Sequence, residues 1–99
     1  EAEQLNAIAR RLQDLSRRNA ELRGIFDFEA KEQRLAEVVK LSEDPAVWND
    51  PKRAQELGRE KKTLEALVGT LTGLDRDLAD SSELFAMART DNDDESLRT

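Results

Sequence analysis

The sequence contains neither histidine nor cysteine. These two residue types supply most of the neutral-pH bases, nucleophiles and transition-metal ligands of proteins. The lack of cysteine also excludes a disulfide framework, which fits a reducing cytoplasm. No glycine-rich loop precedes a helix, so nucleotide phosphates lack the usual binding loop. We therefore predict a cytoplasmic, non-enzymatic stretch with no catalytic, cofactor-binding or metal-binding residues.

Glycine, proline and aromatic residues are also scarce. The 99 residues include four glycines, two prolines, three phenylalanines, one tryptophan and no tyrosine. Together with few β-branched residues, this leaves little material for strands and their turns. No apolar run is long enough to cross a membrane, and the N-terminus does not resemble a signal peptide. We expect neither a sheet nor a membrane segment.

Charged residues and strong helix formers are abundant instead. Charged residues make up 38% of the chain and hydrophobic residues 37%, whereas ordinary domains are about a quarter charged and almost half apolar. Alanine, glutamate, lysine, leucine and arginine together account for 54 of the 99 residues, which is typical of long amphipathic helices. The composition predicts an all-α fold. We expect one domain over residues 1–99, an antiparallel helical bundle or coiled coil of three main helices, the third the longest.

The first predicted helix runs from about Glu3 to Arg23, and Gly24 is expected to end it in the left-handed conformation. Asn19 interrupts an apolar stripe of nearly heptad spacing, formed by Leu5, Ile8, Leu12, Leu15 and Leu22. Four arginines fall on the opposite side: Arg10, Arg11, Arg17 and Arg18. A solvated face is the favoured interpretation of these arginines, and contact with phosphates or an acidic partner is the alternative.

Asp27 is predicted to cap a second helix that ends near Ser42. The residues expected to face inward are Phe28, Leu35, Val38, Val39 and Leu41. Because the connection to the first helix is short, these two helices should form an antiparallel hairpin.

Residues 44–51 separate the second helix from the third and hold both prolines and the only tryptophan. Proline cannot continue a helix and pushes the preceding residue out of helical conformation. Asp50 is expected to cap the third helix, with Pro51 at its first position. We predict that Trp48 is buried at the end of the bundle, in preference to a binding role.

The third predicted helix has about 38 residues and a length of roughly 57 Å, enough to back both earlier helices. Its seven-residue repeat comprises Leu57, Leu64, Leu71, Leu78 and Phe85, with Leu67 and Leu74 three positions after their partners. Gly58, Gly69 and Gly73 lie inside this pattern and indicate close approach or a bend, since each costs up to about 1 kcal/mol against alanine.

Residues from about 91 to 99 are predicted to form an exposed acidic turn or linker, because Thr90 to Glu95 include no apolar member. Asp91, Asp93 and Glu95 imitate the start of a calcium loop, but Ser96 stands where that loop needs glycine. The stretch looks like part of a longer protein, and the sequence leaves open whether a fourth helix follows Thr99. An apolar stripe left uncovered would favour self-association.

The formal net charge of −6 argues against binding of nucleic acid by bulk electrostatics. Residues 1–24 carry +1, and the seven basic and seven acidic residues of the segment 51–90 cancel. Only the first helix is therefore expected to offer a basic patch, and we predict little direct nucleic-acid binding by these residues.

Residues 22–28 and 45–58 form patterns far more specific than a leucine repeat. The second pattern reads Pro-Ala-Val-Trp-Asn-Asp-Pro-Lys-Arg-Ala-Gln-Glu-Leu-Gly. Through these stretches and further single positions, the chain resembles the release factor two family of bacterial class I peptide chain release factors. The further positions are Lys31, Arg34, Leu35, Glu37, Val38, Glu60, Leu64, Glu65 and Leu71.

This resemblance implies the N-terminal domain of a protein that reads UGA and UAA stop codons and triggers hydrolysis of peptidyl-tRNA. It implies a helical bundle that contacts the stalk base of the large ribosomal subunit and cooperates with the GTPase release factor. The family's Ser-Pro-Phe and Gly-Gly-Gln motifs do not occur in these 99 residues. Decoding and hydrolysis are therefore not carried over to this stretch.

Two alternatives come from other functional classes. A freestanding coiled-coil adaptor or chaperone would need only the periodic leucines, and the tryptophan-proline stretch is more specific than that role requires. Nucleic-acid binding by the arginines of the first helix is the second alternative.

Overall fold

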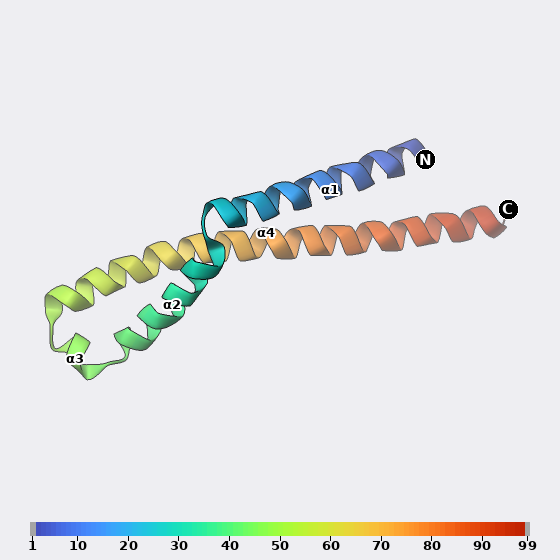
Figure 1. Cartoon of the computed structure of the whole chain (residues 1–99). Helices are drawn as coiled ribbons and strands as arrows, with labels where there is room; N and C mark the ends of the chain where they lie inside the picture. Colours follow the sequence, from blue (N-terminus) through green and yellow to red (C-terminus); the bar gives the residue numbers. More distant parts are fainter. Residues whose placement is uncertain (1, 99) are drawn as a thin grey trace. The chain divides into compact units, whose positions relative to one another are not determined.

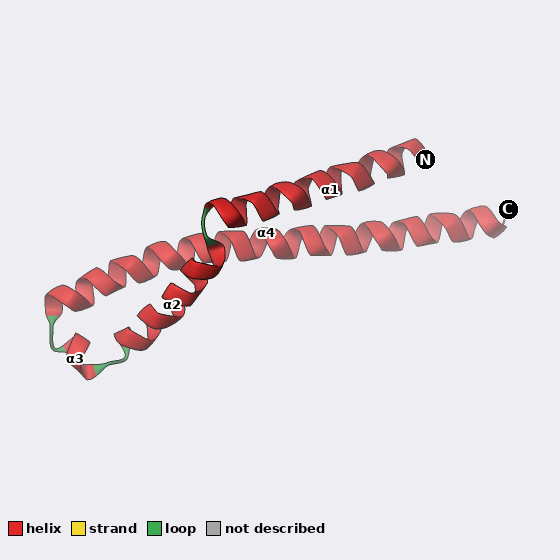
Figure 2. Ribbon diagram, in the orientation of Figure 1, coloured by secondary structure: helices red, strands yellow, loops and turns green. Residues whose placement is uncertain are grey.

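The computed structural model describes the backbone of residues 2–98 and the side chains of residues 2–92. It contains α1 (Ala2–Ile25), α2 (Phe28–Ser42), α3 (Pro45–Trp48) and α4 (Pro51–Arg98), joined by short connections (Figures 1 and 2). No strand occurs in the described backbone, which confirms the all-α prediction with three main helices. No helix within the described residues is both long and apolar enough to cross a membrane.

The chain divides into two compact units. Unit 1 comprises Glu1–Glu21 and Gly73–Thr99, and unit 2 comprises Leu22–Thr72. Because α4 runs through both units, α1 is paired with its second half and α2 with its first half (Figure 1). The expectation that the longest helix backs both earlier ones is confirmed. The α1–α2 hairpin and the single domain stay predictions.

The core of unit 2 forms where α2 and α3 meet the first half of α4. Val38 is fully buried, and the fully or almost fully buried side chains around it are Val47, Leu57 and Leu64. Leu35, Leu41 and Ala54 complete the cluster at its edge. The leucine repeat is buried here because α2 and α3 cover it, as the hydrophobic effect requires.

The junction between α1 and α2 differs from the prediction. Helix α1 continues through Gly24, and the left-handed residue is Asp27, with φ 49° and ψ 53°. Asp27 occupies the cap position of α2 but makes no side-chain capping hydrogen bond. The turn is stabilised instead by Lys31, whose Nζ donates to the carbonyl of Phe26 at 3.0 Å. An aspartate tolerates the left-handed region better than most residues, which explains how it replaces glycine here.

Val47, and not Trp48, is the residue buried between α2 and α4. Asp44 caps the short helix α3 by accepting from the amide of Ala46 at 3.0 Å. In this helical turn successive side chains point in different directions. Val47 is therefore buried, and Trp48 is 68% exposed with its indole N–H donating to the carbonyl of Ser42. The prediction of a buried Trp48 is wrong.

The start of α4 agrees with the start predicted from the sequence. The helix begins at Pro51, and the carboxylate of Asp50 accepts from the amide of Arg53 at 3.3 Å. Its end does not agree, since the backbone is helical to Arg98 and the turn expected from about residue 91 is absent. Charged residues lower the hydropathy of this stretch, but it contains neither glycine nor proline, the residues that usually end a helix.

In unit 1, α1 runs antiparallel to the second half of α4 and makes a thinner apolar contact. Ala9 and Leu12 line a shallow depression together with Phe85 and Arg89, and Asn19 donates from Nδ2 to the carboxylate of Asp75. Asn19 is the only buried residue among those described in this unit. Its predicted inward position is confirmed, and a buried amide of this kind fixes the register of two helices.

Four residues predicted to face inward are instead substantially exposed. They are Leu22 and Val39 (each 38%), Leu74 (39%) and Ile8 (47%). The stripes that contain Ile8, Leu22 and Leu74 have a seven-residue spacing, which drifts on an α-helix of 3.6 residues per turn, so outer members reach the edge of the contact. Val39 follows the buried Val38 by one residue and is turned away from the core by about 100°.

The burial of Val38 predicts the effect of shortening it. Val38→Ala should lower the free energy of unfolding by about 2 kcal/mol, because two buried carbon atoms are lost and a cavity remains. Val39→Ala is the matched control, since the same change in helix propensity occurs at an exposed neighbour. Urea unfolding of both variants measures the difference, and equal losses would contradict the assigned core.

The backbone of the α1–α2 junction predicts opposite effects at two positions. Gly24→Ala should stabilise the fold by about 0.5–1 kcal/mol, because Gly24 is helical and nothing lies within 4 Å of a Cβ placed there. Asp27→Ala should destabilise it by about 1 kcal/mol, since alanine enters the left-handed region at a higher cost. The midpoints of thermal unfolding of both variants test this assignment. If Gly24 were the left-handed residue, Gly24→Ala would be the destabilising change.

Candidate functional site

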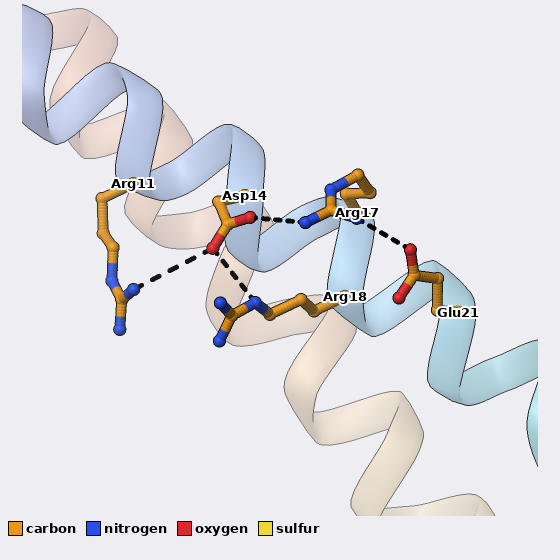
Figure 3. Close-up of polar contacts among 5 residues, drawn as sticks. All are labelled: Arg11, Asp14, Arg17, Arg18 and Glu21. Carbon is orange, nitrogen blue, oxygen red and sulfur yellow. Dashed lines mark hydrogen bonds and ion pairs between the residues drawn. The ribbon is translucent and has the colours of Figure 1, made fainter.

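Three groups of charged side chains are candidates for contact with partners, and the first is the arginine group of α1. All four arginines are exposed, as predicted. Figure 3 shows that three of them surround one carboxylate: Asp14 lies 2.8 Å from Arg17, 3.1 Å from Arg18 and 3.9 Å from Arg11. Arg17 also pairs with Glu21 at 2.9 Å.

These contacts change the electrostatics of the α1 face. The hydrogen bond from Arg17 lowers the pKa of Asp14 below its ordinary value, with Arg18 and Arg11 adding to the effect. The same contact raises the pKa of Arg17, so both groups stay charged near neutral pH. Much of the positive charge of this face is therefore balanced locally, and Arg10 alone among the four has no ion pair with a described side chain. The solvated-face interpretation fits this geometry better than phosphate contact.

The second group is an ion pair between α2 and α4 inside unit 2. Arg34 donates from Nε and Nη2 to the two carboxylate oxygens of Glu60, at 2.9 and 2.8 Å, and from Nη1 to Glu37 at 3.2 Å. The two-point contact with Glu60 raises the pKa of Arg34 and lowers that of Glu60. A fork of two parallel hydrogen bonds defines direction as well as distance. The pair thus fixes the register of α2 on α4.

The third group was not recognised in the sequence. Lys52, Arg59 and Lys62 are exposed, and their spacing of seven and three places them on one face of α4, with Gln55 between the first two. We call these three cations the basic row. Because the charges of residues 51–90 cancel in total, the net charge gives no sign of the row, although its spacing of seven and three can be read in the sequence.

The polar groups described above are ion pairs and exposed cations. Within the described side chains, no group of three or more acidic residues is placed to hold a metal ion. Asp93 and Glu95, which contribute to the imitation of a calcium loop, lie outside the described side chains. The absence of catalytic, cofactor-binding and metal-binding residues stays a prediction.

Comparison with known proteins identifies the family. The PCRF domain model matches residues 31–99, which include α3, α4 and all but the first residues of α2. The chain belongs to the PCRF domain family. The match contains Arg34, Glu60 and the basic row, whereas the arginine group of α1 precedes it.

Relatives of this PCRF-domain chain extend the match to its N-terminal part. It is 59% identical over 97 residues to "Peptide chain release factor 2" of Burkholderia pseudomallei (strain 1106a), covering 98% of this chain and 26% of that protein. It is 52% identical over 99 residues to the protein of the same name from Acidovorax sp. (strain JS42), covering 100% of this chain and 27% of that protein. The resemblance noted in the sequence is confirmed. The chain spans about a quarter of the length of these relatives.

The Arg34–Glu60 pair of the PCRF-domain chain predicts a pH dependence. The pKa of Glu60 is lowered from 4.5 by the hydrogen bond from Arg34, so its folded value lies below its unfolded value. Its contribution to stability is complete above the unfolded pKa and is lost as the pH falls through the folded pKa. Glu60→Gln removes this titration. The variant should therefore be less stable than wild type at about pH 6, and this difference in the free energy of unfolding should shrink as the pH falls to about 3.

Urea unfolding at several pH values tests this prediction. Glu56→Gln is the control, because Glu56 is exposed on the same helix and pairs with no described side chain. Parallel pH profiles for wild type and Glu60→Gln would show that the pair does not contribute to folding in this way.

Proposed function

We propose that these residues form the N-terminal accessory domain of a class I peptide chain release factor, which acts in the cytoplasm in translation termination. The observation that carries this proposal is identity of more than half over essentially the whole chain to proteins named peptide chain release factor 2. The PCRF match over residues 31–99 also supports it. In this proposal the complete protein acts at UGA and UAA codons, as the resemblance implies.

The role of the domain in this proposal is contact and not catalysis. The described charged groups are ion pairs and an unpaired basic row, which suit binding surfaces rather than acid–base chemistry. We propose the ribosome, at the stalk base of the large subunit, as the main partner and the GTPase release factor as a second one. Hydrolysis of peptidyl-tRNA is assigned to parts of the protein outside residues 1–99.

A freestanding adaptor that grips a partner helix is the second candidate. Leu84 and Met87 support it, because they are 66% and 59% exposed and lie three residues apart on one side of α4. The same side chains could support self-association of the domain. This candidate leaves the specific residues 45–58 without a purpose, and we therefore place it second.

Peptide release by the complete gene product tests the proposal. Ribosomes carrying a labelled peptide are programmed with UGA, UAA or UAG, and release is measured with the complete product and with a version lacking residues 1–99. We expect release at UGA and UAA but not at UAG, retained in part after the deletion, because the hydrolysis motifs do not lie in this domain. A sense codon is the control.

Each outcome separates the two candidates. Release that depends on the stop codon is a property of a release factor and not of an adaptor. A complete gene product that releases no peptide at any stop codon would refute the proposal and leave the adaptor as the better explanation. Release unaffected by the deletion would refute the accessory role of the domain.

A further inference from the structure

The basic row lies on the side of α4 that faces away from the core of unit 2. Leu57 and Leu64 point into that core, while Lys52, Arg59 and Lys62 are exposed. Ten residues of helix place the ends of the row about 15 Å apart along the axis. The row therefore presents three cations in line, on a rigid element of the fold.

Among the described side chains, no carboxylate lies within ion-pair distance of the row. Glu60 is held by Arg34, and Glu65 lies 3.8 Å from Lys61. No described side chain forms an ion pair with Lys52, Arg59 or Lys62, and Glu56 is the only other acidic residue in the segment 51–65. This distinguishes the row from the arginines of α1, which are held around Asp14.

The surface beside the row is open, and the side chains that line it end in charged or amide groups. A shallow depression there is lined by Gln55, Gly58, Arg59, Lys61, Lys62 and Glu65. Gly58 has no positive φ, and nothing lies within 4 Å of a Cβ placed on it, so neither backbone conformation nor packing requires glycine at this position. A glycine inside a helix costs about 1 kcal/mol against alanine. Close approach of a ligand to the backbone is a use that this glycine fits.

We propose that the basic row binds the phosphate backbone of double-stranded RNA. Lysine and arginine side chains are the usual partners of phosphate oxygens, and such contacts position a protein without reading sequence. The depression contains no apolar or aromatic side chain, whereas the centre of a protein interface is usually apolar. This inference deepens the proposed function and rests on it for the source of the RNA, which would be ribosomal.

The row also refines the expectation from net charge. A charge of −6 predicts weak binding of nucleic acid by the chain as a whole. Salt screens exposed charges beyond a distance of about 8–10 Å. A duplex seated on the row is therefore governed by the three nearby cations more than by acidic residues farther along the chain.

The dependence of binding on salt tests the row directly. The complete gene product is titrated with a 20-base-pair RNA duplex at several salt concentrations, as wild type and with Lys52→Gln, Arg59→Gln and Lys62→Gln combined. Loss of three phosphate contacts should reduce the slope of log K against log salt by about 2–3. The matched control combines Arg11→Gln, Arg17→Gln and Arg18→Gln, which removes the same charge from paired side chains and should change the slope by less than about 1. An unchanged slope for the row variant, or equal changes for both variants, would overturn the inference.

A crosslink identifies the class of partner on the ribosome. Because residues 1–99 contain no cysteine, Gln55→Cys introduces a single thiol beside the row for a photoreactive label, in a background without other cysteines. With ribosomes programmed with UGA, we expect an adduct with ribosomal RNA. The control is Glu83→Cys on a distant exposed part of α4, which should give no RNA adduct. An adduct with protein alone, or none, would refute RNA as the partner of this face.

The two proposals fail separately in these measurements. Peptide release by the same preparations tests the proposed function, and the duplex titration needs no ribosome. A slope change without any stop-codon-dependent release would support the row and refute the release-factor function. Release without a slope change would support that function and refute the row.

Discussion

The continuous helix α4 is the element on which the rest of the structure depends. Its 48 residues carry one leucine repeat through both compact units. A stripe of this kind is stable in water only where another helix covers it. Helix α2 and the turn α3 supply that cover in unit 2, and α1 supplies it in unit 1. The burial of Leu57 and Leu64, compared with the partial burial of Leu78 and Phe85, shows where the cover is most complete.

Short polar contacts decide how the covering elements are placed. Asp44 and Asp50 accept amide hydrogen bonds at the starts of α3 and α4, so the two prolines become first helical residues rather than interruptions. Arg34 and Glu60 then fix α2 on α4. The consequence is that Val47 fills the position expected for Trp48. The larger aromatic residue lies outside, with only its N–H bound to the chain.

The charged side chains of this protein are distributed unevenly over the faces of its helices. The net charge of a whole segment does not reveal this distribution. The arginines of α1 outnumber the acids of that helix, yet Asp14 gathers three of them. In the first half of α4, Arg34 pairs with Glu60 and Lys61 pairs with Glu65, and no described side chain forms an ion pair with the basic row. The face suited to an anionic partner thus belongs to the segment 51–90, whose charges cancel, and not to α1, which has the basic excess. Ion pairing within and between helices produces this reversal.

The sequence by itself determined the helical class, the start of α4 at Pro51, the end of α2 at Ser42 and the family. These depend on local signals: periodic leucines, a proline preceded by aspartate, and specific residue strings. Only the tertiary structure decided that Asp27 rather than Gly24 takes the left-handed turn, that Val47 rather than Trp48 is buried, and that Lys52, Arg59 and Lys62 remain unpaired. Each of these outcomes depends on which side chains of other turns or helices lie nearby, because burial and ion pairing are properties of neighbours in space and not of neighbours in the chain.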